Sequence, residues 1–252
     1  MKISVITAVY NSRATLATTL DSALSQDHPD KELIVIDGAS TDGTLDVIQH
    51  YAGQLAQVVS EPDHSIYDAL NKGLRLATGE VVGFLHADDR YADTEVLARI
   101  ATAFADPTVA AVYGDLVYVS QVDDDRVIRY WRAGEYRPAR LRWGWMPPHP
   151  TLYLRRAIYE RHGGFDLRYR IAADYDLILR LLSRLTGRVV YLPRVLVRMR
   201  LGGTSNRSLR QILCKSWEDY RALRTNRMGG IGALVWKNFS KIPQFLFKPE
   251  SV

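Results

Sequence analysis

The chain begins with the stretch KISVITAVYN at residues 2–11, and this stretch decides the fold. Residues 3–9 are a short, almost unbroken apolar run, which is typical of a strand buried on both faces of a sheet. The polar residues Tyr10 and Asn11 follow at once. Similar runs recur as LIVI at residues 33–36 and VVGFL at residues 81–85. We therefore expect several buried strands, each of which ends in polar residues.

Helical patterns separate these strands. Between the first two strands, Leu16, Leu20 and Leu24 recur at helical spacing. Further helices are expected over residues 45–51, 66–76 and 94–104, and further strands over 57–60 and 110–113. This alternation over the first 115 residues predicts an α/β fold with a mainly parallel central sheet and helices on both faces.

The second half has a different pattern. Residues 116–122 and 126–131 flank three consecutive aspartates, which predicts a hairpin. A helix is expected over 174–184 and a strand over 189–192. From Ser208 onward the pattern is helical and basic. The GGTS stretch at residues 202–205 is the best candidate boundary, so we expect a domain at 1–205 and a helical tail at 206–252.

Bulk composition narrows the class of protein. The 252 residues have a net charge of +5, and residues 206–252 hold 9 Lys or Arg against 3 Asp or Glu. With Cys214 as the one cysteine, no internal disulfide is possible. We do not expect the opening residues to act as a signal peptide, since they turn polar too soon, and no stretch reaches the ~18–20 apolar residues of a membrane span. We expect a cytoplasmic protein whose basic tail meets an anionic membrane surface rather than nucleic acid.

Acidic residues gather where the predicted strands end. In parallel α/β sheets ligands bind at the carboxyl ends of the strands, so these residues share one edge. They are Asp37, Asp63, Asp88 and Asp89. Such an edge would repel a diphosphate unless a cation intervened, and carboxylates with phosphate oxygens are ligands of Mg²⁺ or Mn²⁺. Taken singly, Asp37 could belong to a turn with Gly38, and Asp88 and Asp89 could cap a following helix.

Familiar nucleotide motifs are missing. No G-x-G-x-x-G follows the first strand, which argues against a dinucleotide oxidoreductase, and no G-x-x-x-x-G-K-[ST] marks a phosphate-binding loop.

The ordered set of strand-end motifs resembles family 2 of the inverting glycosyltransferases, which have the GT-A fold and build bacterial polysaccharides. The matching pieces are TAVYN (7–11), IDGASTDGT (36–44), NKG (71–73), ATGE (77–80), FLHADD (84–89), GFD (164–166), ADYDL (173–177) and GGTS (202–205). Residues 60–73, SEPDHSIYDALNKG, resemble a subgroup that acts in exopolysaccharide and lipopolysaccharide assembly.

The resemblance implies a role for each matching position. It makes Asp174 the general base and Asp88 the ligand of Mn²⁺ or Mg²⁺ on the donor diphosphate. It places His149 and Asp89 on the acceptor side. The nucleoside diphosphate sugar would be held by Thr7, Val9, Tyr10, Asp37, Asp63, Asn71, Lys72, Ala87, Asp88 and Arg200. The acceptor would be a glycan, lipid-linked in polysaccharide synthesis.

Two positions depart from the family pattern. His86 stands where the family usually has the first aspartate of Asp-x-Asp, and it is either a Mn²⁺ ligand or a structural histidine. Ala173 stands where the family often has glutamate. Asp174 itself could be only a helix cap. Two other functions stay open: a non-catalytic sugar-nucleotide binding module and a nucleotidyltransferase.

The tail carries an apolar stripe next to basic residues. Its members are Leu209, Ile212, Leu213, Trp217, Tyr220, Ile231, Leu234, Val235, Phe239 and Ile242. An amphipathic basic helix of this kind suits an anionic lipid surface. The alternative is a pair of helices packed on the catalytic domain.

Overall fold

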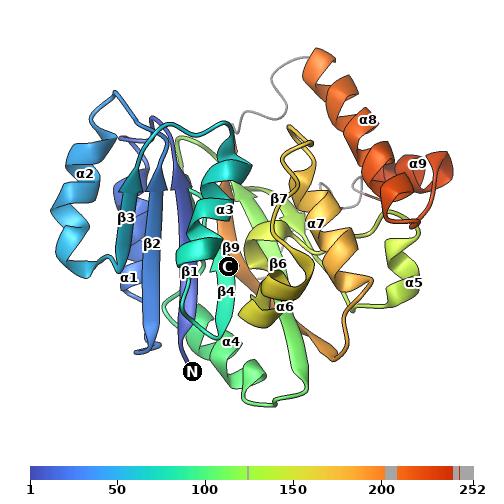
Figure 1. Ribbon diagram of the computed structural model, residues 1–252, viewed down its shortest axis with the longest axis horizontal. Coiled ribbons are helices and arrows are strands. Elements are labelled where there is room, and N and C mark those ends of the chain that lie inside the picture. Colours follow the sequence, from blue (N-terminus) through green and yellow to red (C-terminus); the bar gives the residue numbers. More distant parts are fainter. Residues whose placement is uncertain (124, 202–208, 241–243, 245–252) are drawn as a thin grey trace.

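The computed structural model describes residues 1–123, 125–201, 209–240 and 244. The described strands form one curled sheet with helices against both of its faces (Figure 1). The strands are β1 (Ile3–Val9), β2 (Lys31–Asp37), β3 (Gln57–Ser60), β4 (Val81–Phe84), β5 (Asp89–Tyr91), β6 (Val109–Val119), β7 (Val127–Trp131), β8 (Tyr153–Arg155) and β9 (Arg188–Arg200).

Helices follow most of these strands. They are α1 (Leu16–Leu24), α2 (Thr44–Tyr51), α3 (Ile66–Leu76), α4 (Val96–Phe104), α5 (Pro138–Leu141), α6 (Arg156–His162), α7 (Ala173–Leu182), α8 (Leu209–Thr225) and α9 (Ile231–Phe239), with 3₁₀ turns η1 (Ala52–Gln54) and η2 (His149–Thr151). No helix in the described residues is long and apolar enough to cross a membrane.

The sheet has a parallel half and a mixed half. Its strand order is β3-β2-β1-β4-β8-β6-β9-β5, and β7 pairs with β6. The first four strands are all parallel, which confirms the prediction from the N-terminal pattern. In the other half β6 and β9 are parallel, whereas β8, β5 and β7 run antiparallel to their neighbours. The β6–β7 pair is the predicted hairpin.

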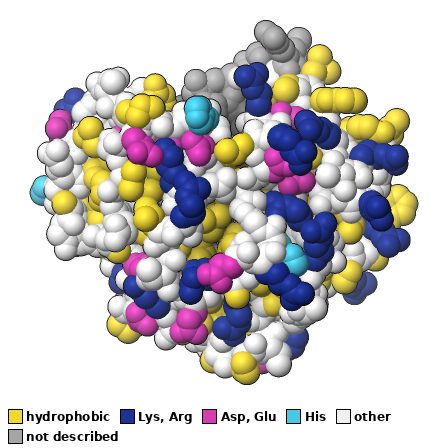
Figure 2. All heavy atoms as spheres, in the orientation of Figure 1, with side chains coloured by type: hydrophobic (Ala, Val, Ile, Leu, Met, Phe, Trp, Pro, Cys, Tyr) yellow, Lys and Arg dark blue, Asp and Glu magenta, His cyan; other side chains and the backbone are white. Residues whose placement is uncertain are grey.

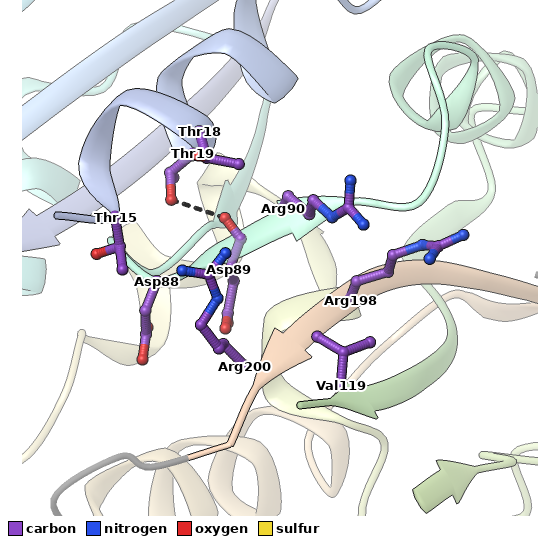
Figure 3. Close-up of a pocket in the computed structure, with 9 residues that line it drawn as sticks. All are labelled: Thr15, Thr18, Thr19, Asp88, Asp89, Arg90, Val119, Arg198 and Arg200. Atoms are coloured by element: carbon purple, nitrogen blue, oxygen red, sulfur yellow. Dashed lines mark hydrogen bonds between the residues drawn. The ribbon is translucent and has the colours of Figure 1, made fainter. Parts of the chain in front are cut away.

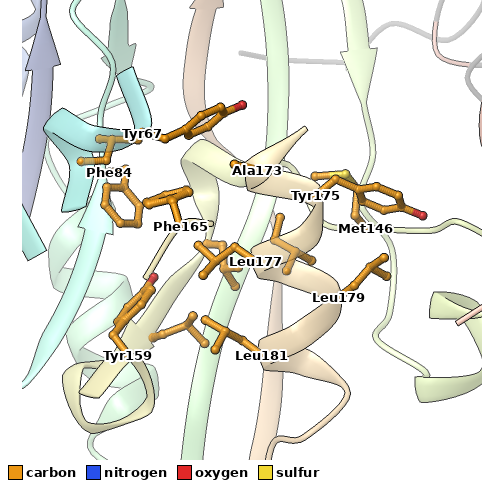
Figure 4. Packing of buried hydrophobic residues seen from close by; sticks show 14 of the residues in the cluster. Tyr67, Phe84, Met146, Tyr159, Phe165, Ala173, Tyr175, Leu177, Leu179 and Leu181 are labelled. Carbon is orange, nitrogen blue, oxygen red and sulfur yellow. The ribbon is translucent and has the colours of Figure 1, made fainter. Parts of the chain in front are cut away.

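Two hydrophobic layers sandwich the sheet. Alternate residues of β1 point to opposite faces, so Ile6 belongs to one layer and Val5 to the other. The first layer joins the sheet to α3, α6 and α7, and Figure 4 shows Phe165, Tyr159, Leu177 and Leu181 packed together in it. The second layer joins the sheet to α4. Burial on both faces explains why the strands read as apolar runs rather than as alternating patterns.

The C-terminal helices pack on this core. Ala222 and Leu223 of α8 are fully buried in the layer that contains α7. Asn226 Nδ2 donates to Asp176 Oδ1 of α7 at 2.8 Å. The tail predicted at 206–252 thus has one helical face against the domain. The boundary expected at residues 202–205 and the stripe residue Ile242 lie outside the described residues, and the side chain of Leu209 is likewise not described.

Candidate active site

The carboxyl ends of the first strands meet at one edge of the sheet. Val9 is paired with Asp37, and Asp37 is paired with Ser60, so β1, β2 and β3 end level with one another. Beyond them, the left-handed residue Asn11 has φ 47°, a conformation that asparagine tolerates. Its side chain accepts from Thr41 N at 2.9 Å and thereby ties the ends of β1 and β2 together. The predicted strand-end edge is present.

A cleft of about 2430 Å³ runs from this edge across the second half of the sheet. It brings together predicted residues that lie far apart in the sequence. Those that line it are Val9, Tyr10, Asp63, Ala87, Asp88, His149, Asp174 and Arg200, with His86 beside them.

Asp88 lies in the turn between β4 and β5. Asp89 N donates to His86 O at 3.0 Å, which closes this turn, and Thr15 of the loop before α1 donates to Ala87 O at 2.8 Å. The helix that Asp88 and Asp89 could have capped is absent here, because Asp89 begins β5. Arg200, at the end of β9, reaches toward both aspartates (Figure 3). The turn therefore presents Asp88 to the cleft and directs Asp89 inward.

Asp89 is almost completely buried in a small pocket beside the cleft, lined by Thr15, Thr18, Thr19, Asp88, Asp89, Arg90, Val119, Arg198 and Arg200. Burial, and then the charge of Asp88, raises the pKa of Asp89 well above its usual value, while Arg200 opposes the shift. Asp89 thus faces Arg200 instead of the open cleft.

His86 and His149 are neighbours in the cleft. Their ring centroids are 5.9 Å apart, and His149 also stacks on Phe84 at 5.3 Å. Burial lowers the pKa of His86, and the charges of Asp88 and Asp174 oppose this shift. Burial and the nearby His86 lower the pKa of His149 to about 3. Both rings are therefore neutral at pH 7.

Asp174 is the second residue of α7, and its first turn opens into the cleft. The helix cap is Ala172, whose side chain cannot accept a hydrogen bond, so Asp174 is not the cap. Its Oδ1 accepts from Tyr175 N at 2.8 Å. Tyr67 of α3 lies against this helix start, and burial followed by the charge of Asp174 raises its pKa well above the usual value.

Five predicted residues do not line the large cleft, and for each the contacts explain why. Thr7 and Asp37 are buried within their strands, and Asp37 accepts from Ser40 and Ser60. Lys72 forms ion pairs with Asp63 at 2.6 Å and with Glu61 at 2.7 Å, and so holds the loop after β3.

Asn71 and Asp89 are the other two. Asn71 uses both ends of its amide on Phe165: Nδ2 donates to Phe165 O at 2.9 Å, and Oδ1 accepts from Phe165 N at 2.8 Å. Its side chain therefore joins α3 to the loop before α7. Asp89 turns into the small pocket already described.

Other cleft residues had no clear sequence signal. Basic side chains line the half of the cleft near β7 and α8, namely Arg129, Arg132, Arg140, Arg170, Lys215 and Lys237. Lys237 is buried, with Nζ 2.8 Å from Asp219 Oδ1 and 3.2 Å from the centroid of the Tyr175 ring. The excess of basic residues in the tail indicates that cations gather there, but it does not indicate which of them face the cleft.

Comparison with known proteins agrees with this geometry. Residues 4–165 match the sequence profile of Glycosyl transferase family 2. The PGL/p-HBAD biosynthesis glycosyltransferase of Mycobacterium bovis is 34% identical over 184 residues, which cover 71% of this chain and 69% of that protein. An uncharacterized glycosyltransferase of Mycobacterium tuberculosis is 33% identical over 186 residues, or 71% of this chain and 68% of that protein.

Solved structures share the fold. Staphylococcus aureus TarS 1-349 in complex with UDP has a TM-score of 0.68 at 22% identity, over 90% of this chain and 65% of that one. This chain thus spans slightly less than two thirds of that structure. The mannosyltransferase PcManGT from Pyrobaculum calidifontis, in complex with GDP-Man and Mn²⁺, has a TM-score of 0.68 at 23% identity, over 97% of this chain and 73% of that one. The family profile covers more than half of the chain, and the protein therefore belongs to glycosyl transferase family 2 and has the GT-A fold.

Proposed function

We propose that this protein transfers a sugar from a nucleoside diphosphate sugar to a hydroxyl group of a glycan acceptor, with inversion at the anomeric carbon. One observation supports this most strongly. Asp88 and Asp174 come from opposite halves of the chain and line the same cleft, and the half-buried His86 lines it with them. One carboxylate near the donor diphosphate and one near the acceptor hydroxyl are what a single displacement requires.

The donor lies at the ends of β1 to β4 in this proposal. Val9, Tyr10 and Ala87 line that end of the cleft. Tyr10 is 66% exposed there, so its ring is available to stack on the nucleobase of the donor. Asp63, held by Lys72, lies beside Gly38. Solved relatives of the same fold hold UDP, UDP-GlcNAc or GDP-Man. These observations support a nucleoside diphosphate sugar as the donor.

A divalent cation suits the residues around Asp88. His86 Nδ1 is buried without a hydrogen-bond partner among the described residues, and Asp88 faces the same cleft. The described residues contain no group of three or more side chains able to hold a metal. Mn²⁺ or Mg²⁺ at Asp88 would thus take its other ligands from the donor diphosphate and water, as Mg²⁺ commonly does. When bound, it would supply charge to offset that of the leaving diphosphate.

The chain's own residues would carry the transfer. Asp174 accepts the proton of the acceptor hydroxyl as its oxygen bonds to the anomeric carbon. The bond from that carbon to the diphosphate oxygen breaks at the same time, and the nucleoside diphosphate leaves. Arg200, at the edge next to Asp88, contributes positive charge near the leaving group. The two sides of the cleft hold both reactants in line, and this positioning supplies much of the remaining rate enhancement.

The acceptor is proposed to be a glycan on a lipid carrier. The acceptor side of the cleft is rich in cations, including Arg129, Arg132 and Lys215. Cations at this position suit a phosphate group between the glycan and its lipid. Such an acceptor is consistent with synthesis of the glycan in the cytoplasm, next to a membrane.

The outer faces of α8 and α9 support peripheral attachment to an anionic membrane. Hydrophobic side chains lie over these helices among Lys and Arg (Figure 2). The exposed members of this lipid-facing surface are Leu213, Trp217, Ile231, Val235, Trp236 and Phe239, with Trp143 from a loop that packs on α9. Their exposed fractions run from 47% to 71%. Aromatic and basic side chains together favour the headgroup region.

A donor screen tests the proposed reaction. The protein is heated with UDP- and GDP-sugars, with Mn²⁺ or with a chelator, and the released product is identified. We expect at least one nucleotide sugar to raise the melting temperature in the presence of Mn²⁺, because it binds only the folded chain. We also expect that donor to be converted slowly to a free nucleoside diphosphate. Release of pyrophosphate would instead identify a nucleotidyltransferase, and stabilisation with no product would identify a binding module.

A further inference from the structure

The loop that leads into α7 is held by a carboxylate from another helix. Glu218 lies on α8 and is 6% exposed. Its two oxygens accept from three consecutive backbone N–H groups: Arg170 N at 3.0 and 3.1 Å, Ile171 N at 2.8 Å and Ala172 N at 2.9 Å. Successive N–H groups that converge on one anion form a concave nest. The loop conformation thus depends on an anion that α8 provides.

This contact lies two residues before the proposed base. Ala172 is the cap of α7 and offers no side-chain acceptor, and Asp174 is the second residue of the helix. Glu218 therefore accepts from the N–H of the cap residue and of the two residues before it, and so holds the chain just ahead of the helix. On the other side of the loop, Tyr67 of α3 donates to Ile171 O at 2.5 Å. The two contacts clamp the helix start between α3 and α8.

We propose that Glu218 is a positioning residue for Asp174, and this proposal rests on the role of Asp174 as base. Without the carboxylate, three neighbouring N–H groups lose their acceptor and the peptide units of residues 170–172 reorient. The first turn of α7 then no longer fixes the direction of the Asp174 side chain. A displacement of about 1 Å at a reacting group costs on the order of 10²-fold in rate.

The test compares Glu218→Gln with a control on the same helix. The amide of this variant would keep one acceptor but would place an NH₂ group against N–H donors, so we expect kcat to fall by ~10-fold or more. The donor KM should stay within about twofold, since the donor end of the cleft is untouched. Glu218→Asp keeps the charge and should recover part of the rate. Leu223→Ala loosens the packing of α8 without touching the loop, and should lower the melting temperature while leaving kcat near the wild-type value.

Two further measurements separate positioning from loss of structure. Amide hydrogen exchange of residues 170–172 should accelerate in Glu218→Gln and not in Leu223→Ala. In an Asp174→Asn background, Glu218→Gln should cause no further loss of rate, because residues that act as a unit are not additive.

The outcomes that overturn the proposal are distinct. If Asp174→Asn loses its activity but Glu218→Gln keeps the wild-type kcat, or if the two losses add in full, Glu218 does not act through Asp174. If Asp174→Asn keeps the wild-type rate, the proposed base is wrong and the positioning role falls with it.

Discussion

The rings of His86 and His149 lie with their centroids 5.9 Å apart in the wall of the cleft. Both pKa values are lowered, chiefly by burial, and that of His149 falls to about 3. The folded protein therefore keeps these rings neutral under conditions in which an unfolded chain would protonate them.

This pair predicts a loss of stability in mild acid. A histidine has a pKa near 6.5 when unfolded. Its contribution to stability is thus fully present above that pH and declines as the pH falls toward the lowered folded-state value. Each such ring contributes a slope of up to ~1.4 kcal/mol per pH unit. His149→Phe keeps the stacking on Phe84 and should flatten the dependence of unfolding free energy on pH between 6.5 and 4. An unchanged slope would contradict the neutral state assigned to His149.

Donor binding should depend on Asp88 more than on His86. Asp88→Ala removes the carboxylate that we assign to the cation, and should abolish the Mn²⁺-dependent part of donor binding in calorimetry. His86→Ala should retain most of that binding. Equal damage in both variants would make His86 a metal ligand.

Asn71 is expected to matter for stability rather than for donor affinity. Asn71→Ala removes two hydrogen bonds to the Phe165 backbone and leaves buried peptide groups unsatisfied, at a cost of ~1–3 kcal/mol. Chemical denaturation should show this loss, while the donor dissociation constant stays within about twofold. The exposed residue Gln49 provides a control, since Gln49→Ala should change neither quantity. A large loss of donor affinity in folded Asn71→Ala protein would instead show that Asn71 contributes to donor binding.

The lipid-facing surface predicts binding to anionic vesicles. Replacing Trp217 and Trp236 by serine removes two exposed aromatic anchors, at 66% and 58% exposure, without opening the core. We expect the full-length protein to float with anionic vesicles and the double variant to float much less. Val58→Ser, on the far edge strand β3, is the matched control. Equal flotation of all three proteins would show that these exposed aromatic side chains of α8 and α9 do not mediate membrane binding. Truncation at residue 205 is unsuitable, because Ala222 and Leu223 belong to the core.

The first half of the fold was predictable because its strands are buried on both faces. Continuous apolar runs such as residues 3–9, each followed by a helical pattern, leave few arrangements other than a parallel sheet. The second half was harder. β9 spans Arg188–Arg200, yet only residues 189–192 read as a strand, because Pro193, Arg194 and later arginines interrupt the apolar pattern. Its length follows from its pairing with β6, a long-range contact that local sequence does not encode.

The residues of the candidate site likewise divide into those that the sequence could predict and those that it could not. Strand-end residues such as Tyr10 and Asp88 were predictable, since parallel strands end at one edge. Asn71 stands in a motif that we expected to line the donor pocket, but the direction of its side chain is set by the loop at Phe165, 94 positions away. No sequence pattern indicated a role for Glu218, because a carboxylate on a polar helix is usually exposed. Only the packing of α8 on α7 turns this side chain inward.

The base assignment is tested most directly by Asp174→Asn. This variant keeps the size of the side chain and an oxygen for the Tyr175 N–H, but it cannot accept the acceptor proton. Single-turnover transfer from a bound donor measures the chemical step separately from binding. Asp166→Asn, which removes a charge from a surface pair with Arg168, is the control and should transfer normally. For Asp174→Asn we predict that the rate falls by ~10²-fold or more, with donor affinity and melting temperature nearly unchanged. A wild-type rate in that variant would contradict the assignment of Asp174 as the base.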